Sequence, residues 1–249
     1  MSSVEPKFAD LERRMKSLAA EDGDIYLPNI LPTAPVCYVF VCMEPSLVGW
    51  AGPNGDKAKS RLAEGFCNFL WSMEDFILHH SIQNYLLKPG QWYHVTDVSK
   101  GAMTVNKAQA ERGLRYRRWY GLLLEELELL ARPDTRYFAV GGAVAGCLTE
   151  LHFPFPFDLI LHYSGQAATS RKKSIEGHES EFVEFRETIS AEDILNTAQR
   201  LLVSSGMSAA LRDETLLRLN RSGPMSESRK MLAFHYKNKF QQSPSVHAP

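Results

Sequence analysis

Apolar residues recur along this chain in two rhythms, and the rhythms predict an alternation of helices and strands. A spacing of three to four positions indicates amphipathic helices, which we expect over residues 4–19, 58–78, 107–131, 190–202, 208–219 and 226–240. Short apolar runs bounded by glycine, proline or polar residues indicate strands, which we expect over residues 36–42, 91–98, 137–140 and 157–162. A further helix should open at Gly141-Gly142.

The order of these elements favours one fold class. Strands that alternate with helices form a parallel sheet that is covered by helices on both faces. Residues 49–55 carry glycine and proline and should form a loop. Residues 165–189 are polar and charged with little periodicity, which indicates a long loop or a small excursion from the fold.

The composition sets limits on size, membrane association and redox state. With 249 residues, 44% of them hydrophobic, the chain can bury one sizeable core. No apolar run approaches the roughly 20 residues that cross a bilayer, and the first residues lack the pattern of a secretory signal. The four cysteines include no Cys-x-x-Cys pair. We therefore expect a cytoplasmic protein with reduced thiols and no iron–sulfur cluster.

The strand predicted over residues 36–42 ends abruptly in a carboxylate. It runs into Met43, Glu44 and Pro45, and a loose polar segment follows. A side chain at the carboxyl end of a sheet strand is held rigidly where α/β proteins place their chemistry. Glu44 is therefore a candidate for a catalytic role. The alternative is a strand-end residue that makes a surface ion pair or caps the next helix.

Three further segments give this motif a context. They are His94–Val98, Tyr137–Gly142 and Leu159–Ser164, and each includes part of a predicted strand. In order and spacing, the four segments resemble the four-strand frame of the uracil-DNA glycosylase superfamily. Glu44 and His162 then stand at the two chemical positions of that frame.

The resemblance implies a fold and an activity. It implies a three-layer α/β/α domain over residues 1–170, with a central four-stranded, mostly parallel sheet and a motif-bearing core over residues 30–170. Residues 171–249 would be a loop and helical C-terminal extension packed on that domain. The implied activity is that of a monofunctional DNA glycosylase without metal or cofactor, which flips out a damaged or modified base and leaves an abasic site. It would serve repair or defence against foreign DNA, and we expect a monomer.

The two residues at the chemical positions would act on the bond that breaks. Hydrolysis at the deoxyribose C1′ passes through a sugar with oxocarbenium character. A carboxylate beneath that sugar, here Glu44, attracts the positive charge and can accept a proton from the attacking water. His162 would donate to O2 of the departing base. Tyr163, Ser164 and Gly165 would form the loop that wedges into the duplex, because a stacked base cannot be reached. Tyr163 replaces the usual proline of the family.

Asp97 stands where one branch of the family has an amide that reads the edge of uracil. The segment Val95–Lys100 resembles the Ile-Thr-Asn-Val-Val-Lys stretch of that branch. An ionised carboxylate only accepts hydrogen bonds, so it favours an exocyclic amine such as cytosine N4 over uracil O4. The base would then be a cytosine-type or modified base, for example a modified cytosine, instead of uracil. Two alternatives stay open: a protonated Asp97 that reads uracil, and a structural Asp97 that binds backbone amides.

The same loop region supplies further candidates. Cys42, Met43 and Trp50 would contact the base, although a tryptophan such as Trp50 can equally be core packing. Ser46 would contact DNA, and both Cys42 and Ser46 stand where glycines usually let the backbone approach the ligand. Asp56 is a possible second acid near the sugar, or a structural residue.

The charge distribution neither requires nor excludes a nucleic acid partner. The net charge of −1 gives no strong global field, but a local patch can bind phosphate on a neutral protein. Arg171, Lys172 and Lys173 follow His162 closely, and we expect them to contact DNA. Four arginines between Arg112 and Arg118 could also pair with phosphates or form a solvated helix face.

Two other functions stay open at this level. The fold could be kept as a catalytically inactive module that binds DNA or nucleotides. The departures at Cys42, Ser46 and Tyr163 favour that alternative. The chain could also be a hydrolase of small nucleosides or sugars.

Overall fold

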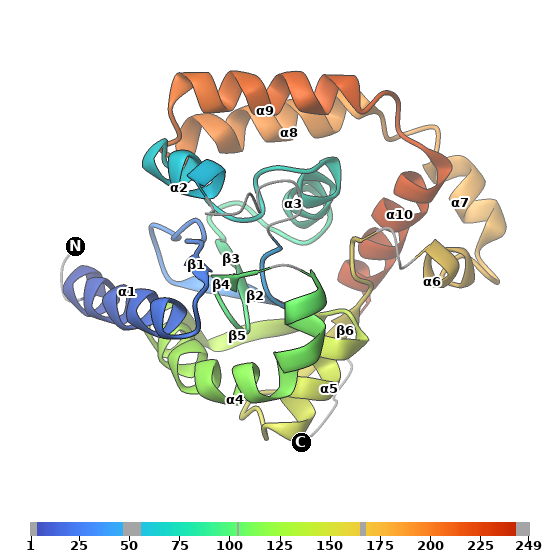
Figure 1. The fold of residues 1–249 in the computed structure, drawn as a ribbon. Coiled ribbons are helices and arrows are strands. Elements are labelled where there is room, and N and C mark those ends of the chain that lie inside the picture. The colour runs from blue at the N-terminus through green and yellow to red at the C-terminus, as the bar shows by residue number, and fades with distance from the viewer. Residues whose placement is uncertain (1–3, 47–55, 104, 165–167, 243–249) are drawn as a thin grey trace.

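A four-stranded parallel sheet forms the centre of the computed structural model (Figure 1). The structure describes residues 4–46, 56–103, 105–164 and 168–242. Neighbouring strands are all parallel, in the order β3-β2-β5-β6. The strands are β2 (Val36–Cys42), β3 (Tyr93–Asp97), β5 (Ala131–Val140) and β6 (Phe157–Ile160).

Helices surround this sheet, and a two-stranded ribbon lies beside it. The ribbon pairs β1 (Ile25–Tyr26) with β4 (Gly101–Ala102) in antiparallel orientation. The helices are α1 (Val4–Glu21), α2 (Asp56–Ala63), α3 (Met73–Tyr85), α4 (Val105–Leu130), α5 (Gly142–Glu150), α6 (Ala168–Lys173), α7 (Glu179–Phe185), α8 (Ala191–Ser204), α9 (Ala209–Arg221) and α10 (Glu227–Gln241).

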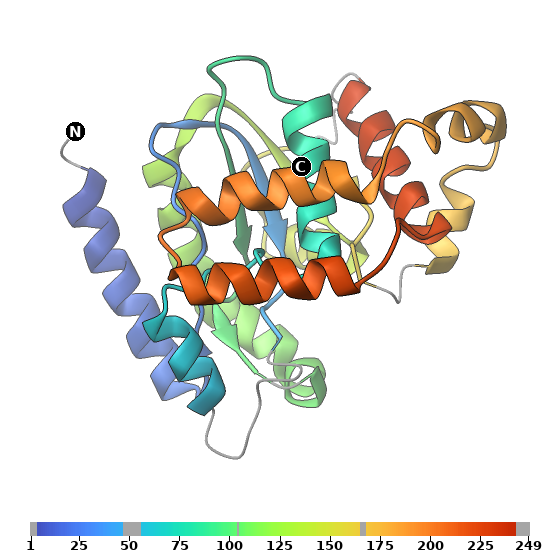
Figure 2. The same ribbon diagram turned by 90° about the horizontal axis from the view of Figure 1, so that it is seen from above.

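Both faces of the sheet are buried because successive strand residues are apolar. Val39 and Val41 belong to the cluster formed with α4 and α5. Phe40 points to the other face, where it stacks on Phe138 with 4.7 Å between ring centroids, and Phe240 of α10 meets both rings edge-on. The helix α3 covers this second face beside α10, and α8 and α9 cross outside it (Figures 1 and 2). The α/β/α fold class with a helical C-terminal extension is confirmed.

Most predicted elements are found, and one predicted helix is wrong. The structure has no single helix over residues 58–78, but α2 and α3 with a break between them. Gly65 has φ +83°, and a Cβ there would lie 2.9 Å from the Gly206 carbonyl oxygen, so the chain must turn out of the helix at this point. Ser72 then starts α3 through a capping box with Asp75.

Two further regions differ from the sequence predictions. The strand predicted over residues 137–140 begins earlier, at Ala131, directly after α4. Residues 168–173 and 179–185 form two short helices, so the long-loop alternative for residues 165–189 is wrong where the structure describes them. The predicted loop over residues 49–55 lies outside the described residues.

The strand order determines where a site can form. The chain leaves β2 for β3 on one side and later returns to place β5 on the other side of β2. In parallel α/β sheets, ligands bind at such a reversal of strand order, outside the carboxyl ends of the strands. The segments that follow β2, β3, β5 and β6 all begin at this edge of the sheet.

Candidate functional site

Glu44 lies two residues beyond β2, in a largely buried position beside α4. Its side chain is 6% exposed. Arg112 binds both carboxylate oxygens, with Nη2 2.7 Å from Oε1 and Nε 3.3 Å from Oε2. Tyr116, one helical turn further along α4, donates its hydroxyl to Oε2. Burial and the charge of Glu44 raise the pKa of Tyr116, so this hydroxyl stays protonated. Three donors therefore hold the carboxylate in one orientation.

His162 lies two residues beyond β6, against the end of β5. Gly141 has φ +98°, and a Cβ on it would lie 3.0 Å from the Cβ of His162. Only glycine lets the histidine come this close in that backbone conformation. The imidazole stacks on Tyr163 with 4.6 Å between ring centroids. Its Nδ1 accepts a hydrogen bond from the Ser164 amide at 3.0 Å.

These contacts define the protonation state of His162. Burial lowers its pKa, the charge of Glu44 raises it, and two arginine charges lower it, with a net downward shift. The imidazole is therefore neutral at pH 7. Because Nδ1 accepts from a backbone N–H, the neutral ring carries its hydrogen on Nε2. His162 is thus able to donate a hydrogen bond through Nε2.

Glu44 lies within electrostatic reach of both Asp97 and His162. The charge of Glu44 raises the pKa of both His162 and Asp97. Asp97 ends β3 and pairs in register with Cys42, the last residue of β2. The structure therefore gathers residues from three strand ends at one edge of the sheet.

Asp97 is the outer member of a buried polar network. Its Oδ2 accepts from Nδ2 of Asn68 at 2.8 Å and from Nδ2 of Asn29 at 3.3 Å. Burial raises the pKa of Asp97 to about 7, although Lys100 and the two amides lower it. Within the described residues, the amides that bind this carboxyl group come from side chains.

Lys100 and Glu126 form the inner part of the network. Lys100 Nζ lies 2.9 Å from Glu126 Oε2 and 2.6 Å from Asn29 Oδ1. His94 and Thr96 also bind the Glu126 carboxylate, at 2.9 and 3.0 Å. Burial alone would raise the pKa of Glu126, but these partners lower it to about 2. The negative charge of Glu126 is thus matched by Lys100.

Lys100 also fixes the orientation of the Asn29 amide. An ammonium group only donates, so it must face Oδ1 of Asn29 and leave Nδ2 to face Asp97. The Oδ2 atom of Asp97 then accepts from two amides and cannot carry a proton. When Asp97 is protonated, its proton lies on Oδ1. The network therefore leaves Oδ1 as an acceptor when Asp97 is ionised and as a donor when it is neutral.

The C-terminal helices hold the segment that carries His162. His235 of α10 accepts from the Leu161 amide at 3.1 Å, and Tyr236 donates to the Leu161 carbonyl at 3.0 Å. Arg171 of α6 donates to the carbonyls of Tyr163 and Ser164. The position of His162 thus depends on residues far from it in sequence.

The predicted phosphate contact of Arg171 is therefore corrected. Its side chain is buried, and its guanidinium also donates to Ser228 of α10 at 2.9 Å. The Arg171 guanidinium donates its hydrogen bonds to groups inside the protein, and it is not available to DNA. Lys172 and Lys173 are exposed at the end of α6, close to this loop.

The remaining predicted residues take varied positions. The side chain of Cys42 is buried and its carbonyl accepts from Val98, while the Met43 carbonyl accepts from Ser99. Ser46 is exposed and forms an isolated bridge with Met103. Asp56 begins α2 with a side chain that is 77% exposed, 4.0 Å from Lys59. Trp50 and Gly165 lie outside the described residues.

Several residues of the site were missed at the sequence level. Arg112 was expected to face phosphates or solvent, and its pairing with Glu44 was missed. Arg112 and Tyr116 had a usable signal, since positions four apart share one helix face. Asn29 and Asn68 had none, because they come from irregular segments. The other arginines of α4 are ion-paired within the protein, for example Arg117 with Glu150, which reduces their availability to phosphates.

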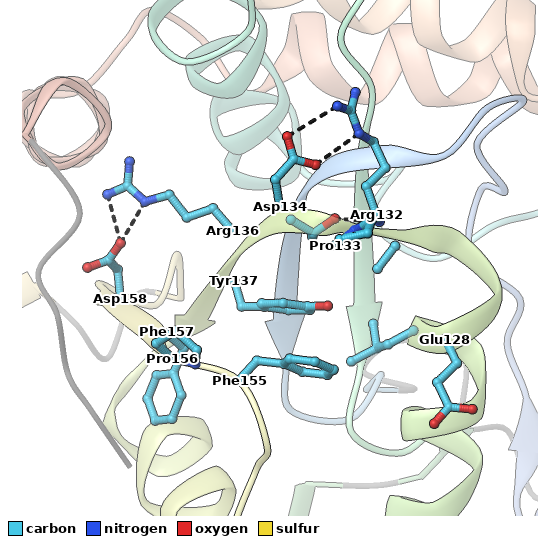
Figure 3. Close-up of a pocket in the computed structure, with 13 residues that line it drawn as sticks. Glu128, Arg132, Pro133, Asp134, Arg136, Tyr137, Phe155, Pro156, Phe157 and Asp158 are labelled. Atoms are coloured by element: carbon cyan, nitrogen blue, oxygen red, sulfur yellow. Dashed lines mark hydrogen bonds and ion pairs between the residues drawn. The ribbon is translucent and has the colours of Figure 1, made fainter.

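A cavity of considerable size lies elsewhere. It has a volume of about 580 Å³ and is lined by residues at the amino ends of β5 and β6 (Figure 3). Tyr137 and Phe155 stack there with 4.7 Å between centroids. Its two arginines are already paired with aspartates, Arg132 with Asp134 and Arg136 with Asp158. These pairs disfavour a phosphate ligand.

Metal ligands and membrane spans were searched within the described residues. No three side chains among the histidines, cysteines and acids described are arranged to hold a metal ion. No helix in the described ranges is long and apolar enough to span a bilayer. All four cysteines are free.

Comparison of the chain with protein-family models, with curated proteins and with solved structures finds no match. The resemblance to uracil-DNA glycosylases that the sequence motifs suggest is therefore tested by none of these comparisons.

Proposed function

We propose that this chain is a DNA glycosylase that flips out a damaged or modified base and hydrolyses its N-glycosidic bond. One observation carries the proposal. Glu44, Asp97 and His162 stand at or just beyond the carboxyl ends of β2, β3 and β6, at one edge of the sheet. Reading the base, stabilising the sugar and releasing the base would each use one of these groups. All three must then lie within the span of one nucleotide.

His162 would stabilise the departing base. As the bond from C1′ to the base nitrogen breaks, its electron pair moves onto the base and negative charge grows on the carbonyl oxygen O2. A neutral imidazole with its hydrogen on Nε2 can donate to that oxygen. The low pKa of His162 suits this role, because donation without full proton transfer does not need a charged ring.

Glu44 would act mainly through its charge and by orienting water. Its three hydrogen bonds use most of the roughly four lone-pair positions of a carboxylate. Arg112 and Tyr116 therefore occupy both carboxylate oxygens and would keep them fixed beneath the sugar. A water molecule held by the remaining lone pair would add to C1′ as the oxocarbenium character develops, and the proton that it loses would pass through solvent to the departing base anion, which leaves as the neutral base.

Asp97 would read the edge of the base. With a pKa of about 7, it is part ionised and part protonated near neutral pH. Its Oδ1 then accepts from an exocyclic amine in one state and donates to a keto oxygen in the other. We expect relative activity on amino-bearing bases to rise between pH 6 and pH 8, and relative activity on keto-bearing bases to fall.

An abasic-site cleavage assay tests the proposal. Oligonucleotides that each carry one uracil, hypoxanthine or modified cytosine would be incubated with the wild type, Glu44→Gln and His162→Asn, followed by alkaline strand cleavage. Loss of about 100-fold or more in both variants supports catalysis by these residues. His178→Ala, an exposed substitution on the N-terminal side of α7, is the matched control and should keep full activity.

The second candidate function is a module that binds DNA or nucleotides. The hydrogen bonds that already occupy the Glu44 carboxylate favour it. A carboxylate bound by Arg112 and Tyr116 is well suited to a structural role. Under this alternative the wild type binds DNA but releases no base from any substrate, and Glu44→Gln changes stability without changing DNA affinity.

A further inference from the structure

A second cavity lies on the α3 face of the sheet, beside the edge strand β3. Its volume is about 260 Å³. Two large apolar side chains among its lining residues, Leu31 and Trp92, are 43% and 44% exposed. Exposed apolar side chains at an enclosed hollow commonly mark a ligand site. The wall also includes Phe69, His79 and Tyr93.

His79 contributes a ring surface to this cavity and no acid–base group. Its Nε2 lies 3.1 Å from the Phe69 carbonyl oxygen and its Nδ1 lies 2.7 Å from the Tyr93 hydroxyl. Because the carbonyl only accepts, Nε2 carries the hydrogen and Nδ1 accepts from Tyr93. Both nitrogens are thus used within the protein. Burial lowers the pKa of His79 to about 4, so the ring is neutral.

Among the residues that the structure describes, none that lines this cavity is an Asp, Glu, Lys or Arg. An ionic ligand would lose its hydration there without gaining a counter-charge, which is costly. The polar groups that line the cavity are neutral, among them the Thr33 hydroxyl and the Asn68 carboxamide. Asn68 donates a hydrogen bond from Nδ2 to Asp97. Its Oδ1 is therefore the atom that can accept a hydrogen bond from an N–H of a ligand.

The wall that closes the cavity is also part of the candidate active site. Asn68 binds Asp97, and the ring of Phe69 meets that of Tyr163 edge-on at 6.4 Å. Phe69 has φ +65°, a conformation that costs a non-glycine residue energy. The hydrogen bond from His79 to its carbonyl helps to hold it there.

We propose that this cavity is a second binding site, for a neutral heteroaromatic molecule of one or two rings that carries an N–H donor. The aromatic lining matches a flat ring, the volume lies just below the roughly 300 Å³ of pockets for drug-sized ligands, and the uncharged wall excludes nucleotides and carboxylates. The Asn68–Phe69 wall places this ligand next to the group that would read the base.

Binding of small probes tests this site without requiring any enzymatic activity. Indole and benzimidazole would be titrated into the full-length protein by calorimetry and by NMR. Benzoate and benzamidine are the charged counterparts of similar size. We expect dissociation constants of about 10 µM to 1 mM for the neutral rings, binding at least about tenfold weaker for the charged ones, and a shift of the Trp92 indole N–H signal.

A pair of adjacent variants localises the binding. Ser204 lines the cavity at the end of α8, whereas Val203 is exposed beside it and does not line it. Ser204→Trp should cover the opening and weaken indole binding about tenfold or more. Val203→Trp should leave binding unchanged. Both changes lie at exposed positions, and unfolding curves would check that the fold is kept.

Three results would overturn the proposal. They are the absence of binding by either neutral ring, equal binding by the charged analogues, or binding that leaves Trp92 and the Ser204→Trp variant unaffected. A partner protein that buries one apolar side chain in the cavity would give the first result. None of these outcomes bears on base release, so the second site and the glycosylase activity fail or hold separately.

Discussion

Replacing Asp97 by asparagine should make the protein more stable above pH 7. The carboxyl group is fully buried among Asn29, Asn68 and Lys100, and burial raises its pKa from the usual 3.8 to about 7. Between pH 3.8 and about pH 7, the folded protein therefore keeps a proton on Asp97 that the unfolded chain has already released. Stability falls as the pH rises from about 4 to about 7, because the unfolded state binds fewer protons.

The size of this effect follows from the pKa difference. A shift of about three pH units corresponds to about 4 kcal/mol, at 1.36 kcal/mol for each unit. Asparagine has nearly the same shape and cannot ionise. At pH 8 the Asp97→Asn variant should exceed the wild type in free energy of unfolding by up to about 4 kcal/mol. At pH 4 the two proteins should be nearly equal.

Urea unfolding followed by circular dichroism between pH 4 and pH 8 measures this difference. Asp56→Asn is the matched control, because the Asp56 side chain is 77% exposed. A wild type that does not lose stability relative to Asp97→Asn over this range would refute the reasoning. So would an equal change in Asp56→Asn.

Other changes test neighbouring parts of the account. Glu126→Gln leaves the buried Lys100 without its counter-charge and should lower the free energy of unfolding by about 3 kcal/mol in urea titrations. Tyr116→Phe removes a donor to Glu44, which should cost about 2 kcal/mol of stability. Arg171→Met frees the carbonyls of the His162 loop and should lower base release about tenfold with little change in DNA affinity measured by fluorescence anisotropy. Replacing Lys172 and Lys173 by alanine should reduce the slope of log affinity against log salt by about 2 for duplex DNA.

Local patterns were sufficient to predict the four strands of the central sheet and most of the helices, but not the short ribbon of β1 and β4. Val36–Cys42 is apolar throughout, as a strand covered on both faces requires, and the residues that follow it must lie at the sheet edge. The break between α2 and α3 was not predictable from periodicity. It depends on the backbone of Gly65 meeting Gly206, a contact between residues far apart in sequence.

The candidate site shows the same division between local and distant causes. Glu44, Asp97 and His162 were found because each stands at or just beyond a strand end. The partners that set their behaviour come from other elements. Arg171 looks like a basic surface residue in sequence, and only the packing of α6 against α10 turns its guanidinium inward.

Whether Glu44 and His162 share one site can be measured by titrating the His162 imidazole. The imidazole signals of His162 would be followed by NMR from pH 4 to pH 9 in the wild type, in Glu44→Gln and in Glu128→Gln, an exposed control on α4. The charge of Glu44 raises the pKa of His162, so removing it should lower that pKa while the control leaves it unchanged. A pKa of His162 that is the same in Glu44→Gln and in the wild type would contradict the account.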